Sequence, residues 1–286
     1  MALSNKLVKK FVSEALQEDA VFSDVTTHAF ISREIKVKAQ IIAKQQGVLC
    51  GMDLVREAFK SFDKKLTFIG KKRDGAFLRR GDCVAVITGR ACSVLSCERV
   101  ALNFVSYLSG ISTQTYEVVK KVGRSGIKIL DTRKTTPLFR TFEKYAVLTG
   151  QGKNHRLNLS DQYLVKDNHL FIIRKTKTLD VLLRRDLKIP FEIEVDNFAQ
   201  LKEAVMYRPT IVMLDNFSPS EIKQAVSWLK RTFPHKNKRP LIELSGGITY
   251  ENISRFCIRG VDYISLGALT HSSKALDFSL EIADLI

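Results

Sequence analysis

Short apolar runs, each ending in a charged or small polar cluster, recur along the second half of the chain. They cover residues 127–130, 163–165, 191–195, 210–214, 241–244 and 263–266. Helix-like sequence follows several of them, notably at 199–206 and 220–229, where apolar residues recur at helical spacing. This alternation predicts β/α units around a parallel barrel or sheet. In such folds the active site lies at the carboxyl ends of the strands, where the polar clusters fall.

The first hundred residues have a different pattern. Strands are expected at 35–43 and 82–88 and a helix at 53–62, with glycines marking the turns between them. Apolar positions at helical spacing predict a further helix at 96–108, which would join this part to the barrel-like part. The fold class is therefore α/β, with an N-terminal α+β domain before the barrel-like domain.

Composition excludes several classes of protein. The 286 residues are 45% hydrophobic, and the mean hydropathy of −0.05 suits a soluble chain. No apolar run reaches the length of a membrane span, and lysines interrupt the amphipathic N-terminal stretch, so it lacks a signal peptide's apolar core. The five cysteines form no CxxC pair, which argues against a disulfide framework or a zinc site. We expect a cytoplasmic protein.

The formal charge of +16 and the pI near 9.7 raise the alternative of nucleic-acid binding. The basic clusters, however, are short, dispersed and not interleaved with aromatic residues. They lie at 71–73, 79–80, 120–121, 184–185 and 236–239. This scatter is typical of a solvated surface, so neither a nucleic-acid nor a membrane partner is expected.

A dense set of cations falls at three predicted strand ends. Arg133 and Lys134 follow one strand, His155 and Arg156 follow the loop at 150–152, and Lys166 ends the next strand. If these strands share one rim, their side chains converge on one cavity, where arginine offers a planar fork to a carboxylate or phosphate. The alternative is structural ion pairing with Glu143, Asp161 and Asp167. The repeated strand-end placement favours a multiply anionic ligand.

Acidic and glycine-rich positions complete the candidate site. Glu192 and Glu194 face the same side of one predicted strand, and Asp215 ends the next. Glu194 and Asp215 could hold Mg²⁺ together with substrate phosphates, or stabilise a cationic sugar transition state, whereas Glu192 is interpreted as structural. Backbone N–H groups at Ser245, Gly246 and Gly247, and at Gly267 after the next strand, could cradle a phosphate.

Four motifs identify a family: DTRKTTP at 131–137, EKYAV at 143–147, NHR at 154–156 and KDNH at 166–169. In order and spacing they resemble those of quinolinate phosphoribosyltransferases, also called carboxylating nicotinate-nucleotide pyrophosphorylases. The resemblance extends over nearly the whole chain. It implies an N-terminal open-faced α/β sandwich (1–112), a C-terminal α/β barrel (113–272) and a tail (273–286) that can pack back on the first domain.

The resemblance also implies roles for individual residues. Arg133, Lys134, His155, Arg156 and Lys166 match the quinolinate-binding pattern, Thr135 lies within the same motif, and Arg99 would reach in from the partner of a homodimer with shared sites. Glu194 and Asp215 match the acidic pair near the ribose and Mg²⁺. The loops 245–247 and 265–267, with Ser245, Gly246, Gly247, Ser265, Leu266 and Gly267, match those around the 5-phosphate. Lys134, Lys166, Glu194 and Asp215 are expected to be catalytic.

The implied reaction joins quinolinate to phosphoribosyl pyrophosphate and releases pyrophosphate and carbon dioxide, giving nicotinate mononucleotide for de novo NAD biosynthesis. Three positions depart from the family pattern, because Leu138, Gln151 and Ser23 stand where glycine is usual. Two of them lie in loops next to the expected site, so loop conformation and rate are in question more than reaction type. The alternatives are a non-decarboxylating phosphoribosyltransferase, a paralogue associated with molybdenum transport, and a nucleic-acid-binding protein on the same barrel.

Overall fold

The computed structural model describes residues 3–176 and 189–286 of the chain. The basic pair at 184–185 lies outside the described residues. Contacts between elements divide the chain into two compact units. The first unit comprises Met1–Glu117, Pro137–Gln151 and Ser272–Ile286, and the second comprises Val118–Thr136 and Gly152–His271.

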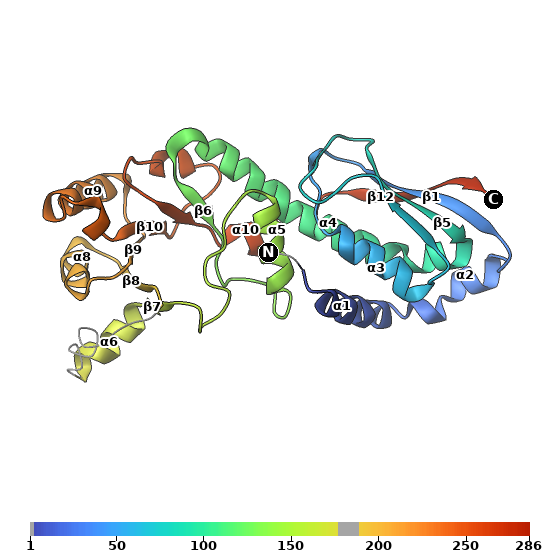
Figure 1. Cartoon of the computed structure of the whole chain (residues 1–286), viewed down its shortest axis with the longest axis horizontal. Coiled ribbons are helices and arrows are strands. Elements are labelled where there is room, and N and C mark those ends of the chain that lie inside the picture. Colours follow the sequence, from blue (N-terminus) through green and yellow to red (C-terminus); the bar gives the residue numbers. More distant parts are fainter. Residues whose placement is uncertain (1–2, 177–188) are drawn as a thin grey trace. The chain divides into compact units, whose positions relative to one another are not determined.

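An antiparallel four-stranded sheet forms one layer of the first unit. Its order is β12 (Phe278–Leu285), β1 (Lys36–Ala43), β5 (Cys83–Arg90) and β3 (Thr67–Gly70). Side chains of β1 alternate between exposed and buried, as expected for a strand with one solvated face. Figure 1 shows the C-terminal strand β12 beside β1, so the end of the chain completes the sheet of the first unit. A short pair, β2 (Gly47–Val48) and β4 (Phe77–Leu78), forms a second small sheet.

Helices make up the rest of the first unit. They are α1 (Asn5–Glu18), α2 (Val25–Phe30), α3 (Met52–Phe62), α4 (Ala91–Val122) and α5 (Arg140–Thr149), with a short 3₁₀ turn at Val21–Ser23. The last five residues of α4 belong to the second unit. Val8, Val12 and Leu16 lie four residues apart along α1 and are buried, which gives this helix its apolar face. Asp24 begins α2 by accepting a hydrogen bond from the Thr27 backbone N–H at 2.9 Å.

The joining helix is longer than its sequence pattern predicts, because α4 continues far beyond residue 108. Gly110 lies inside it, where an added Cβ would be 2.2 Å from the Lys274 carbonyl oxygen. This glycine therefore allows a close backbone approach and does not mark a helix end.

The division into units differs from the boundaries expected from the sequence, which place residues 137–151 in the barrel domain. In the structure, α5 packs within the first unit. The Ser112 hydroxyl donates to the Ala146 carbonyl at 2.8 Å, and the rings of Phe11, Phe139 and Phe142 pack against one another in tilted and edge-on orientations. These contacts explain why the segment clusters with the N-terminal elements.

A six-stranded parallel sheet forms the second unit and confirms the α/β class. Its order is β6 (Lys128–Leu130), β11 (Tyr263–Ser265), β10 (Leu241–Ser245), β9 (Ile211–Asp215), β8 (Phe191–Val195) and β7 (Tyr163–Val165). Every neighbouring pair is parallel. The register pairs Ser245 with Asp215 and Ser265 with Leu130, so the carboxyl ends of these strands meet at one edge.

Helices connect these strands. They are α6 (Asp167–Lys175), α8 (Phe198–Ala204), α9 (Pro219–Thr232) and α10 (Ala268–His271), with 3₁₀ turns at Gly123–Ser125, Val205–Tyr207, Lys236–Lys238 and Ile253–Phe256. Figure 1 shows α8 and α9 beside β8, β9 and β10. Ser218 and Glu221 form a capping box at the start of α9, and Pro219 occupies its first turn. Among the helices of the described ranges, none is both long and apolar enough to cross a membrane.

Candidate active site

A cavity of about 510 Å³ opens at the carboxyl edge of the parallel sheet. This volume suits a small-molecule site. All of its lining residues belong to the second unit. They are Thr132, Arg133, Lys134, His155, Arg156, Leu164, Lys166, Glu194, Met213, Asp215, Glu243, Ser245, Gly246, Gly247, Ser265, Gly267 and His271. Residues from all six strands or the segments after them therefore reach one space.

Four permanent cations line this cavity: Arg133, Lys134, Arg156 and Lys166. Within the described residues, the first three make no ion pair within 4 Å, and only Lys166 does, with Glu194. The pKa of Arg156 is lowered, chiefly by burial and then by the positive charge of Arg133. Two guanidinium groups that repel each other in a partly buried cavity are the arrangement expected of a site for a multiply charged anion.

The acidic side of the cavity is formed by β8 and β9. The Glu194 side chain is only 11% exposed, and its carboxylate accepts from the Lys166 ammonium group. Burial raises the pKa of Glu194, and the charge of Asp215 adds to that effect, whereas the contact with Lys166 opposes it. Asp215 accepts a hydrogen bond from the side-chain amide of Asn216 at 2.7 Å. The two carboxyl groups thus interact electrostatically across neighbouring strands.

Asn216 links the acidic side of the cavity to the glycine loop after β10. Its backbone N–H donates to the Ser245 carbonyl at 3.0 Å, and its φ of 56° lies in the left-handed region. An added Cβ at Gly246 would lie 2.2 Å from the Asn216 side-chain oxygen, so only glycine fits there. Gly246 and Gly247 have φ of 85° and 63°. Successive residues in such conformations can direct their backbone N–H groups toward an anion.

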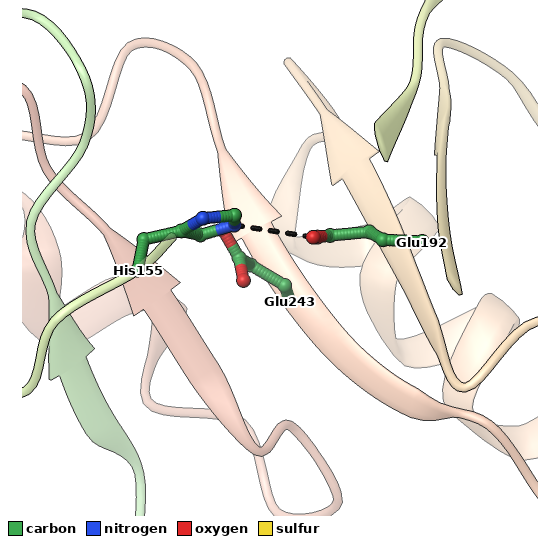
Figure 2. Close-up of side chains that lie close together, drawn as sticks. All are labelled: His155, Glu192 and Glu243. Carbon is green, nitrogen blue, oxygen red and sulfur yellow. Dashed lines mark hydrogen bonds and ion pairs between the residues drawn. The ribbon is translucent and has the colours of Figure 1, made fainter. Parts of the chain in front are cut away.

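Beneath the cations, three titratable side chains meet inside the sheet (Figure 2). His155 reaches in from the segment after Gly152, Glu192 from β8 and Glu243 from β10. The His155 Nε2 lies 3.1 Å from Glu192 Oε2 and 3.7 Å from Glu243 Oε1. Their donor atoms all lie within 4.8 Å of one another, close enough to surround an ion. The backbone N–H of His155 donates to Asp131 at 2.9 Å, which anchors the segment that carries the ring.

The structure brings together most of the residues expected from the sequence, and three lie elsewhere. Arg99 is on α4 in the first unit, and the Thr135 hydroxyl donates to the carbonyl of Arg133 at 3.3 Å. Leu266 is buried, and its backbone N–H donates to the Leu130 carbonyl, joining β11 to β6. None of these three side chains belongs to the described lining of the cavity.

Sequence reasoning missed three polar residues of the lining, Thr132, Glu243 and His271. Glu243 stands in an apolar run, but it lies two residues before Ser245 in the same strand. Side chains two apart in a strand share a face, so the position of Ser245 was the signal that could have identified Glu243. His271 ends α10, and its ring lies near Gly267, where an added Cβ would be 3.1 Å from Nε2.

Comparisons with known proteins cover both units. The model of the quinolinate phosphoribosyl transferase N-terminal domain matches residues 24–109, and that of the C-terminal domain matches residues 111–281. A probable carboxylating nicotinate-nucleotide pyrophosphorylase of Methanocaldococcus jannaschii is 38% identical, over 96% of each chain. One from Bacillus subtilis is also 38% identical, over 96% of this chain and 93% of that protein.

A solved structure agrees with these sequence matches. The nicotinate-nucleotide pyrophosphorylase from Francisella tularensis superimposes with a TM-score of 0.88 at 36% sequence identity. The match covers 98% of each chain.

Proposed function

The chain belongs to the quinolinate phosphoribosyltransferase family, and from this membership we propose how its cavity works as a carboxylating nicotinate-nucleotide pyrophosphorylase in NAD biosynthesis. The reaction transfers a phosphoribosyl group from phosphoribosyl pyrophosphate to the ring nitrogen of quinolinate, with release of pyrophosphate and carbon dioxide. The observation that carries the proposal is that Arg133, Lys134 and Arg156, which make no ion pair with the residues that the structure describes, line one cavity with Lys166. Both substrates are anions that such a set would bind.

We propose that Arg133 and Arg156 hold the two carboxylates of quinolinate. A guanidinium group presents two parallel N–H donors to a carboxylate, which fixes both its position and its plane. Lys134 and Lys166 add point charges, and the imidazole ring of His155 lies in the same cavity lining. Orientation of the pyridine nitrogen toward the sugar would contribute to catalysis by making the reaction effectively unimolecular.

Glu194 and Asp215 are the proposed stabilisers of the sugar. Cleavage of the bond to pyrophosphate leaves positive charge on the anomeric carbon and ring oxygen, and a nearby carboxylate stabilises such an oxocarbenium-like state. The contact with Lys166 holds the Glu194 side chain in place. After ribosylation, loss of carbon dioxide leaves an electron pair on the adjacent ring carbon, which the positive charge of the pyridinium nitrogen stabilises and which then takes a proton from solvent. This step therefore requires positioning more than a further catalytic group.

The glycine loops are proposed to hold the 5-phosphate. Ser245, Gly246 and Gly247 follow β10, and Ser265 and Gly267 follow β11. An added Cβ at Gly267 would lie 3.0 Å from Cδ of Lys134, so glycine leaves room for that side chain. Backbone N–H groups together with a lysine form a common type of phosphate site.

Mg²⁺ is the proposed cofactor, and the oxygen donors present fit it. Glu194 and Asp215 lie on adjacent strands of the same cavity, and Mg²⁺ is usually held by one or two carboxylates plus substrate phosphates. When bound, it would neutralise charge on the departing pyrophosphate.

We also propose a homodimer in which Arg99 of each copy serves the other's site. A cytoplasmic location is proposed as well, and it suits the five free cysteines.

The test is quinolinate-dependent release of pyrophosphate and carbon dioxide, with nicotinate as the comparison substrate. Arg133→Ala should lower kcat/KM for quinolinate by about thirtyfold or more, because truncating one partner of a charge pair that bound substrate buries costs about 2–5 kcal/mol. Arg231→Ala, which removes an exposed arginine at the end of α9, is the matched control and should retain activity. Undiminished turnover in Arg133→Ala, or a preference for nicotinate, would contradict the assignment.

A further inference from the structure

In the triad of His155, Glu192 and Glu243, the first and last residues line the cavity, and the chemistry described so far gives neither glutamate a role. Both glutamate side chains are fully buried, and the histidine side chain is 8% exposed. Figure 2 shows the imidazole edge and both carboxyl groups pointing toward one another. Two carboxyl groups buried side by side need a compensating positive charge, and a proton or a metal ion can supply it.

Hydrogen bonds assign the proton of the imidazole. The Arg156 backbone N–H donates to His155 Nδ1 at 2.8 Å, so Nδ1 is an acceptor and the ring proton lies on Nε2. This Nε2–H points to Glu192 Oε2 at 3.1 Å. The same carboxyl oxygen accepts from the side-chain amide of Gln162 at 2.7 Å. One oxygen of Glu192 is thus satisfied by two donors.

Three buried oxygens of the pair are not satisfied. Within the described residues, Glu192 Oε1 and both oxygens of Glu243 have no hydrogen-bond partner. Buried acceptors without donors are costly, and two adjacent ionised carboxylates would add repulsion. A single proton on Glu243 would remove the repulsion and turn one unsatisfied acceptor into a donor directed at another.

We propose that Glu243 is a neutral carboxylic acid that donates its proton to Glu192, and that this pair is the positioning device holding His155 with its proton on Nε2. Glu243 acts through Glu192 and His155, so it is a positioning residue for the quinolinate subsite. The proposal rests on the assignment of His155 to that subsite. A neutral Glu243 also leaves only two carboxylates in the lining against four permanent cations.

A metal ion suits the triad less well than a proton. To bind a metal through Nε2, His155 would have to move its proton to Nδ1, which already accepts from the Arg156 backbone. A proton leaves this hydrogen bond unchanged.

The electrostatic surroundings of Glu243 agree with a neutral acid. Burial, with the charge of Glu192 adding to it, raises the pKa of Glu243 to about 8, whereas His155 and Ser265 oppose the rise. Met213 of β9 and Tyr263 of β11 are its neighbours in register. Glu243 lines both the cavity described above and a second cavity of about 280 Å³. Besides Tyr263, the titratable or charged groups that line these two cavities with it and His155 are Lys128, Arg133, Lys134, Lys153, Arg156, Lys166, Glu194, Asp215 and His271.

The proposal predicts an alkaline loss of function with a defined sign. Below pH 8 Glu243 carries its proton, and above pH 8 the protonated fraction falls about tenfold per unit. The resulting second negative charge would draw the His155 side chain away from its resting position. We therefore expect kcat/KM for quinolinate to fall above pH 8, about tenfold by pH 9.

Glu243→Gln tests this because a glutamine amide is neutral at every pH and can donate as the acid does. Wild type should lose kcat/KM for quinolinate about tenfold between pH 7 and pH 9, whereas the variant should have the same kcat/KM at both pH values. Glu221→Gln, which changes an exposed glutamate of the α9 capping box, is the matched control and should retain the wild-type profile. An unchanged alkaline loss in Glu243→Gln would overturn the proposal.

Infrared spectroscopy gives a readout that does not depend on turnover. Wild type and Glu221→Gln should show the carbonyl band of a protonated carboxyl group at pH 7, and this band should vanish as the pH rises through 8. The band should be missing in Glu243→Gln. Wild type without the band at pH 7, or purified with a stoichiometric metal that Glu243→Gln lacks, overturns the proposal. Absence of quinolinate turnover in wild type would refute the proposed function and leave the infrared result to decide the protonation state.

Discussion

Leu138 occupies a backbone conformation that suits glycine. Its φ is 65°, in the left-handed region, and its side chain is among the most exposed of the apolar residues, at 86%. The loop after the DTRKTTP motif therefore holds an exposed leucine in a left-handed conformation. Replacement of Leu138 by glycine should therefore stabilise the protein.

The magnitude follows from two opposing terms. A left-handed conformation costs an L-residue about 1–2 kcal/mol. Glycine removes this cost, but its greater freedom in the unfolded chain returns about 0.4–1 kcal/mol. The side chain is so exposed that its loss removes little buried area. The expected net gain for Leu138→Gly is about 0.5–1 kcal/mol.

Urea unfolding at one fixed protein concentration measures the effect. Leu138→Ala is the matched control, because alanine loses the same distal side chain but retains the Cβ that clashes in this conformation. We expect Leu138→Gly to have a higher midpoint than both wild type and Leu138→Ala. If the glycine variant is no more stable than the alanine variant, the backbone of Leu138 is not strained and the reasoning fails.

Two further predictions concern the cavity and its assembly. Asn216→Gly should leave stability equal or raised, because the residue has a φ of 56°, yet lower kcat several-fold because Asp215 loses its amide donor. Loss of stability together with activity would show that Asn216 only supports the fold. In the second, mixing inactive Arg99→Ala and Lys134→Ala subunits should restore part of the activity if each site uses both copies. Steady-state assays before and after subunit exchange measure this, and mixtures as inactive as the separate variants would argue against shared sites.

The strands of the second unit were the most predictable part of the fold. Residues 163–165 and 191–195 form β7 and β8 with the predicted bounds. These runs either are apolar or alternate between apolar and polar residues, and polar clusters mark their ends. Local sequence therefore determines these strands. The same clusters explain why Arg133, Lys166 and Asp215 could be assigned to one rim before any distance was known.

What the sequence could not predict depends on contacts between distant segments. The pairing of β12 with β1 joins residues more than two hundred positions apart, and no local pattern specifies that partner. The length of α4 was underestimated because Gly110 resembles a helix end, whereas it permits a close approach to Lys274. Leu138 and Gln151 were recognised as departures, but only the backbone angles show that both retain a left-handed conformation.

Glu243 was also overlooked because its partners lie on distant segments. A lone glutamate within an apolar run is usually taken to be an exposed residue of the strand. In each central strand, the residue two positions before a rim residue faces the same interior. Glu192 precedes Glu194, Met213 precedes Asp215, and Glu243 precedes Ser245. A second layer therefore lies beneath the rim, and two of its members are carboxyl groups with His155 between them. Since that layer supports the His155 ring, a proposed substrate-binding group, the protonation state of Glu243 should affect the rim. The difference between the alkaline pH profiles of wild type and Glu243→Gln measures this coupling directly.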